Sequence, residues 1–178
     1  MIDTAKVTGA ARRLKSLLTV GVGLLLALTA VGAVMMLMDP IGVGEELATI
    51  AGYDAVTIAP WQAWALSAIV AVHLVLWIVL LAVARSTFNQ LADRMPAMAA
   101  KSARQAATLL WGMLVWGIVS QPIASAVATW GNPAGERALA IGFGTAQLSI
   151  AFSALIAGCM AHALALGAEL WQDHQEVV

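Results

Sequence analysis

Residues 61–84 read WQAWALSAIVAVHLVLWIVLLAVA and contain no aspartate, glutamate, lysine or arginine. A helix needs about 20 consecutive apolar residues to cross the roughly 30 Å hydrocarbon layer of a bilayer, and this stretch supplies them. Because lipid offers no hydrogen-bond partner to an open backbone, a segment of this kind must be helical. We therefore expect a transmembrane helix that ends before Arg85.

Three other stretches have the same character, and they cover residues 16–38, 105–130 and 139–168. The first follows a basic tail, as a signal sequence does, but its apolar run exceeds the roughly 7–15 residues of a signal peptide. Small residues around Ala30 to Ala33 leave cleavage open as the alternative. The expected fold class is therefore all-α. We predict a single transmembrane domain over residues 1–178, an integral membrane four-helix bundle with antiparallel up-down topology.

The composition agrees with lipid as the solvent. Of the 178 residues, 61% are hydrophobic and 11% are charged, whereas soluble domains carry about 25% charged residues. A soluble protein of this composition would expose large apolar patches. The formal net charge is -1, which gives no field that would attract nucleic acid, so no direct nucleic-acid partner is expected.

Lysine and arginine are distributed unevenly between the two sides of the membrane. The tail before residue 16 and the loop 85–104 hold eight of the nine, and the opposite loops hold only Arg137. Because cytoplasmic segments carry the excess of lysine and arginine, we expect the N-terminus, this loop and the tail 169–178 to be cytoplasmic. The expected location is a bacterial inner membrane that the chain crosses several times.

The outer loops are residues 39–60 and 131–138. Glycines argue against one regular element throughout the first of them, because glycine weakens a helix. A short interfacial helix around residues 45–50 is expected there. These glycines are Gly42, Gly44 and Gly52.

Two prolines mark expected helix breaks. Apolar residues in the cytoplasmic loop recur at near-helical spacing, so the second span should continue past the membrane surface and break near Pro96. Pro122 lies inside the third span, where proline removes a backbone hydrogen bond and produces a kink. We expect Gln121 or Ser120 to satisfy the freed carbonyl.

The spans contain few polar side chains, namely His73, Gln121, Gln147 and His162. No charged residue lies near the centre of any span. Two histidines on different helices can ligate one b-type haem, so His73 and His162 are the candidate cofactor ligands. His73 lies twelve residues before Arg85, and His162 lies seven residues before Glu169. Because both of these span ends are expected to be cytoplasmic, the two rings should differ in membrane depth by roughly 7–8 Å. We therefore prefer histidines bonded to a carbonyl or hydroxyl of a neighbouring helix, with no cofactor, and keep haem as an alternative.

Small residues recur four apart in two spans and predict helix–helix contacts, because close backbone approach is what brings helices together in lipid. Association of the chain with further copies of itself, as a homo-oligomer, is also consistent with the sequence. The residues are Thr19, Gly23 and Ala27 in the first span and Ser149, Ser153, Ala157 and Ala161 in the fourth.

No catalytic or metal-binding motif is found. The chain has no GxSxG, HExxH or phosphate-binding glycine loop, and Cys159 is its one cysteine. We therefore expect a protein that is not an enzyme and has no metal site.

The predicted cytoplasmic face carries opposite charges on two segments. The loop is basic through Arg94, Lys101 and Arg104, and the tail is acidic through Glu169 and Asp173. These five residues are the candidate partner-binding site. Arginines at anionic lipid headgroups with a solvated tail are an equally good interpretation.

Two segments resemble a family of uncharacterised bacterial membrane proteins, the domain of unknown function 2975. They are FNQLADRMPAMAAKSARQ, from Phe88, and HALALGAELWQDHQEVV, from His162. Pro96, Ala103 and Arg104 match the family's loop, and Glu169 matches its acidic tail, whereas ADRM at residues 92–95 replaces a basic-Gly and Phe pattern. The resemblance implies four spans but no known activity. Members accompany small helix-turn-helix regulators, which implies a membrane-bound sensing or sequestering role.

Three functions are consistent with these observations. The first is a non-enzymatic interaction, sensing or regulatory protein that contacts a cytoplasmic regulator or a membrane protein through its loop and tail. The second is a haem- or small-molecule-binding bundle. The third is a structural accessory subunit of a larger membrane complex.

Overall fold

The computed structural model describes residues 4–53, 57–93, 95–133, 137 and 139–176. It contains five helices and, within those ranges, no strand. Four of the helices are long and apolar enough to cross a membrane, so the chain is an all-helical, multi-pass membrane protein. The helices are α1 (Thr4–Met38), α2 (Pro40–Ile50), α3 (Pro60–Ala92), α4 (Pro96–Ala128) and α5 (Thr145–Glu176).

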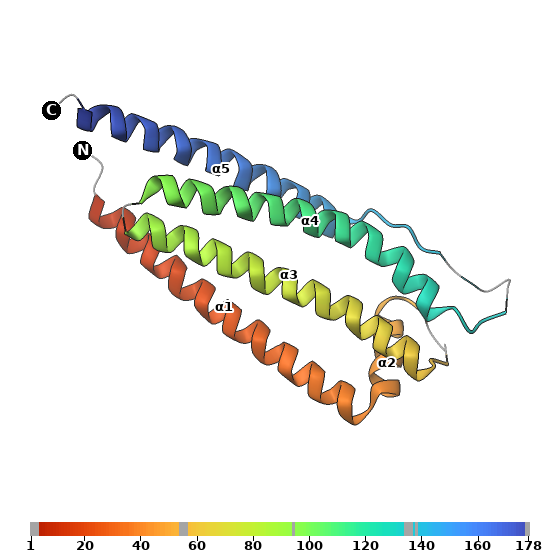
Figure 1. Cartoon of the computed structure of the whole chain (residues 1–178). Coiled ribbons are helices and arrows are strands. Elements are labelled where there is room, and N and C mark those ends of the chain that lie inside the picture. Colours follow the sequence, from red (N-terminus) through yellow and green to blue (C-terminus); the bar gives the residue numbers. More distant parts are fainter. Residues whose placement is uncertain (1–3, 54–56, 94, 134–136, 138, 177–178) are drawn as a thin grey trace.

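The long helices lie side by side in the order α1, α3, α4, α5 (Figure 1). α4 packs against both α3 and α5, α1 packs against α3, and the short α2 packs mainly against α3. The N-terminus, the α3–α4 turn and the C-terminus lie at one end of this layer, and α2 lies at the other (Figure 1). α3 and α4 are therefore the inner helices, and α1 and α5 are the edges.

α4 owes its inner position to small side chains. Alanine and serine allow the backbones of neighbouring helices to approach closely, which stabilises helix pairs in lipid. The enclosed residues of α4 are Ala99, Ala100, Ser102, Ala103, Ala106, Ala107, Leu110, Met113, Leu114, Ser120, Ser125 and Ala128.

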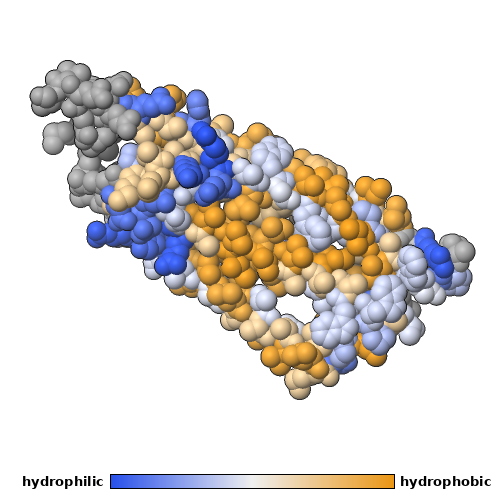
Figure 2. Space-filling model, viewed as in Figure 1, coloured by the Kyte–Doolittle hydropathy of each residue, from blue (hydrophilic) through white to orange (hydrophobic). Residues whose placement is uncertain are grey.

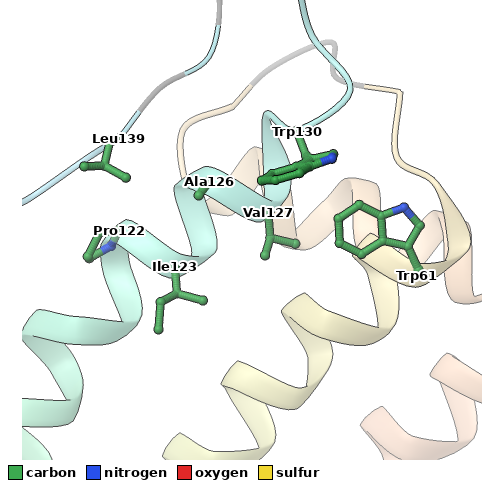
Figure 3. Close-up of a pocket in the computed structure, with 7 residues that line it drawn as sticks. All are labelled: Trp61, Pro122, Ile123, Ala126, Val127, Trp130 and Leu139. Atoms are coloured by element: carbon green, nitrogen blue, oxygen red, sulfur yellow. The ribbon is translucent and has the colours of Figure 1, made fainter.

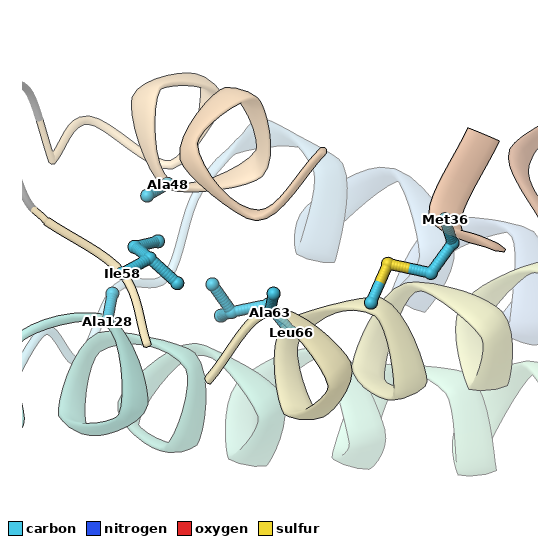
Figure 4. Packing of buried hydrophobic residues seen from close by; sticks show 6 residues of the cluster. All are labelled: Met36, Ala48, Ile58, Ala63, Leu66 and Ala128. Atoms are coloured by element: carbon cyan, nitrogen blue, oxygen red, sulfur yellow. The ribbon is translucent and has the colours of Figure 1, made fainter. Parts of the chain in front are cut away.

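A buried cluster joins α2 to the adjacent ends of α1, α3 and α4 (Figure 4). Gly44 is essential to it, because a Cβ there would lie 2.6 Å from Ala63 Cβ. Glycine therefore permits the α2–α3 contact. The cluster consists of Met36, Ala48, Ile58, Ala63, Leu66 and Ala128.

α2 begins earlier than the helix predicted around residues 45–50. Asp39 caps it, since Asp39 Oδ1 accepts a hydrogen bond from Gly42 N at 3.0 Å, and Pro40 occupies the first turn, where proline is tolerated. The glycines did not prevent helix formation, because the cap and the packing of Gly44 on Ala63 compensate for their low propensity.

Only three residues, 93–95, separate the end of α3 from the start of α4. As the sequence predicts, α3 continues beyond residue 84, and α4 begins at Pro96. This short connection keeps α3 and α4 adjacent.

The fourth span is shorter than predicted, because α5 begins at Thr145 rather than residue 139. The described residues before it form a non-helical segment held on α4. Ser125 Oγ accepts a hydrogen bond from Ala140 N at 2.9 Å, and Gln121 Oε1 accepts one from Gly142 N, also at 2.9 Å. Side chains of α4 thus satisfy backbone donors that a helix would otherwise use.

Pro122 lies inside α4, as expected. Ser120 Oγ donates to Gly117 O at 3.4 Å, and Gln121 is used by Gly142. Neither of these contacts reaches the carbonyl of Ile118, four residues before the proline. The prediction that one of these two side chains satisfies that carbonyl therefore finds no supporting contact.

Candidate functional site at the charged end

Hydrophilic residues gather at the end of the molecule where the termini lie, and the middle of the visible face is apolar (Figure 2). Cations reach this end from α1, α3 and α4, because the uncharged runs of these helices stop there. The cations at this end whose side chains the structure describes are Arg12, Arg13, Lys15, Arg85, Lys101 and Arg104.

Lys101 and Arg104 lie three residues apart on α4 and are both exposed. The opposite face of the same turns is enclosed through Ala99 and Ala103. Ser102 Oγ also donates to Gln90 Oε1 of α3 at 2.9 Å. The two cations therefore project from a firmly packed helix rather than from a mobile loop.

The predicted acidic partners are placed only in part. Glu169 is exposed on α5 and forms no ion pair with Lys101 or Arg104 within the described part of the chain. Arg94 lies outside the described residues. Asp173 belongs to α5, but its side chain is outside the described set. The described members of the predicted site are therefore solvent-facing and not paired with one another.

A second group of polar residues at this end was not predicted as a site. Lys15 Nζ donates to Asn89 Oδ1 at 2.6 Å, which links α1 to α3. Together with Arg85 and Ser86 these residues line a pocket of about 190 Å³. A signal was present in the sequence, because Lys15 and Arg85 are the first charges that bound two uncharged runs.

His73 is bonded to a neighbouring helix, but its partner there is an indole N–H rather than the expected carbonyl or hydroxyl. Trp116 Nε1 of α4 donates to His73 Nδ1 at 3.0 Å, and the rings lie 6.0 Å apart. His73 Nδ1 also lies 3.2 Å from the carbonyl oxygen of Ile69, four residues earlier on the same helix. Trp116 thus has a polar role in addition to the volume it fills.

His162 is exposed on α5, and α4 lies between α5 and the helix that carries His73 (Figure 1). The two histidines are therefore on helices that the inner helix separates. This arrangement does not favour one haem bound by both rings.

An aromatic group marks the opposite end of the layer. Trp61 and Trp130 pack edge to face with ring centroids 6.4 Å apart, and the Arg137 guanidinium lies 5.9 Å from the Trp130 ring. These indoles border an apolar pocket of about 470 Å³ beside Pro122 and Leu139 (Figure 3). Exposed indoles at a helix end are typical of the membrane–water interface, and none of the described side chains that line this pocket is titratable.

Metal-binding geometry is not found in the described ranges, where no three histidine, cysteine, aspartate or glutamate residues come together. Cys159 is exposed on α5. The chain was compared with protein-family models, with curated proteins and with solved structures, and none of these comparisons found a match. The resemblance to the domain of unknown function 2975 stays a prediction.

Proposed function

We propose that this chain is a non-enzymatic protein of a bacterial inner membrane that binds a partner protein through its charged end. The proposed topology is antiparallel up-down, with both termini and the α3–α4 turn in the cytoplasm. Support comes from the placement of eight of the nine lysines and arginines in the two segments that this topology leaves inside.

One observation carries the proposal. Lys101 and Arg104 are exposed on α4 and form no ion pair within the described residues, although their helix is firmly packed. A rigid basic surface of this kind fits an acidic surface on a partner, because electrostatic complementarity speeds association and selects the partner. A cytoplasmic regulator or the cytoplasmic face of another membrane subunit would provide such a surface.

Charge reversal tests this role. We expect Lys101→Glu/Arg104→Glu to abolish capture of the partner in a crosslinking pull-down from native membranes. The matched control is Arg12→Glu/Arg13→Glu, which reverses two exposed cations on α1 at the same end. Equal capture by both double variants and the unmodified chain would refute the proposal.

Topology has its own test. Reporter domains fused after Gly52 and after Ala99 should lie in opposite compartments, outside and inside respectively. The same fusions in the two double variants show whether orientation has changed. Reporters found on one side of the membrane would remove the topological basis of the proposal.

A second candidate is a small-molecule-binding bundle. The observation in its favour is a groove of about 470 Å³ between α3, α4 and α5, lined almost entirely by apolar side chains. Mass spectrometry of molecules that copurify in gentle detergent tests for an apolar ligand. The haem version predicts a Soret band that disappears in His73→Ala or His162→Ala, and a colourless, folded preparation would exclude it.

A further inference from the structure

The pocket between α1 and α3 presents hydrogen-bond donors and almost no acceptors. Lys15 lies on α1, whereas Arg85, Ser86 and Asn89 lie on α3. Asn89 is already used at both ends of its amide, because its Oδ1 accepts from Lys15 Nζ and its Nδ2 donates to Asp93 Oδ2 at 3.0 Å. Asn89 therefore orients Lys15 rather than competing for a ligand.

The remaining groups have donors to offer. Arg85 forms no ion pair within the described chain. Ser86 Oγ accepts a hydrogen bond from Gln90 Nε2 at 3.2 Å, which leaves its hydroxyl proton available. Lys15 has two further N–H groups after the bond to Asn89. Among the described side chains no carboxylate lines the pocket, and Asp93 is linked to Lys15 through Asn89.

The depth of the pocket points to the class of ligand. Lys15 directly precedes the uncharged run of α1, and Arg85 directly follows the uncharged run of α3. Both cations therefore lie where the hydrocarbon layer meets the headgroups, at the end of the molecule that is proposed to be cytoplasmic. Arginine and lysine at this level meet lipid phosphates, and the guanidinium fork binds phosphate with two parallel hydrogen bonds.

We propose that Lys15, Arg85 and Ser86 form a specific binding site for a phosphate group, as carried by an anionic phospholipid. Asn89 is a positioning residue that holds the lysine. The site is separate from the basic surface of Lys101 and Arg104, because it opens between α1 and α3 rather than on α4. A bound lipid would also hold α1 on α3.

Lipid titration of the full chain in mild detergent, followed by native mass spectrometry, tests the site. We expect tight binding of phosphatidylglycerol in preference to phosphatidylcholine. In Lys15→Gln/Arg85→Gln the Kd for phosphatidylglycerol should rise about tenfold or more, since hydrogen bonds to charged groups are strong. The matched control, Lys101→Gln/Arg104→Gln, removes the same charge at the same end and should change the Kd by less than about twofold.

Further arms identify the source of the phosphate and guard against misfolding. If millimolar inorganic phosphate displaces phosphatidylglycerol, the site is assigned to a soluble phosphate. If it does not displace the lipid, the site is assigned to the lipid. Lys15→Gln keeps an amide donor for Asn89, and Lys15→Arg keeps the charge and should retain binding. Equal Kd values in the two glutamine double variants would overturn the proposal. Because partner capture depends on the other pair of cations, the two proposals can fail separately.

Discussion

The edge helix α1 and the inner helix α4 show opposite relations between apolarity and burial. α1 exposes most of its leucines and valines, with Leu17 at 68% and Leu24 at 61%. Among its side chains that the structure describes, only Ala11 and Met36 are buried. α4 has fewer large apolar residues but encloses a long face of alanine and serine. Of these two helices, the more apolar one is the less buried one.

The solvent explains this inversion. Lipid tails are as apolar as leucine, so transferring leucine from lipid to a helix interface gains little. Close packing and polar contacts decide which helices meet, and small side chains permit both. On α1 the large apolar side chains therefore mark a surface that faces lipid, whereas on α4 alanine and serine mark a surface that faces protein. The predicted contact face of Thr19, Gly23 and Ala27 on α1 is exposed.

The largest expected effect comes from enlarging an enclosed alanine of α4. Ala128 is fully buried against Ala63 and Leu66. Ala128→Leu should lower the free energy of unfolding by about 1–3 kcal/mol, because overpacking displaces neighbours. The control is Ala30→Leu on α1, an exposed position, with an expected change within about 0.5 kcal/mol. Denaturant titration in detergent measures both, and equal losses would break the contrast between the helices.

Glycines sharpen the same contrast with a smaller change. A Cβ at Gly44 would lie 3.0 Å from Ala63 Cα, whereas one at Gly23 of α1 meets nothing within 4 Å. Gly44→Ala should therefore destabilise the α2–α3 contact by about 1 kcal/mol or more. Gly23→Ala should leave stability unchanged or raise it by up to about 1 kcal/mol, through helix propensity. Thermal unfolding midpoints compare the two, and a loss at Gly23 would show that α1 has a partner that its exposure hides.

The smallest effect concerns the hydrogen bond between α3 and α4. Trp116→Phe removes the donor to His73 Nδ1 and should cost about 0.6 kcal/mol, the average for such bonds between membrane helices. Trp111→Phe is the matched control, because Trp111 lies half exposed on the same helix. Unfolding free energies of the two variants differ only if the His73 contact contributes, so equal values would remove it as a stabilising feature.

The start of the fourth span illustrates where prediction from sequence fails. Residues 139–144 are apolar enough to extend a membrane helix, and hydropathy alone assigns them to one. Their backbone donors instead bond to Gln121 and Ser125, which lie 21 and 15 residues away from the donors that they serve. Propensity and hydropathy are local properties, and neither reports a partner at that separation.

The sequence by itself determined the solvent, the number of spans and the position of the α3–α4 break. The solvent and the spans follow from uncharged runs long enough to cross a bilayer. The break follows from a proline at the start of a helix. Uncharged runs and prolines can be read from consecutive residues. Only the tertiary structure decided which helices are inner and which are edges. It also decided that Lys15 meets Asn89, 74 residues away, and that His73 meets Trp116, 43 residues away. The physical reason is that contacts in lipid depend on small-residue packing and on single polar pairs between helices, and these form only when particular faces come together.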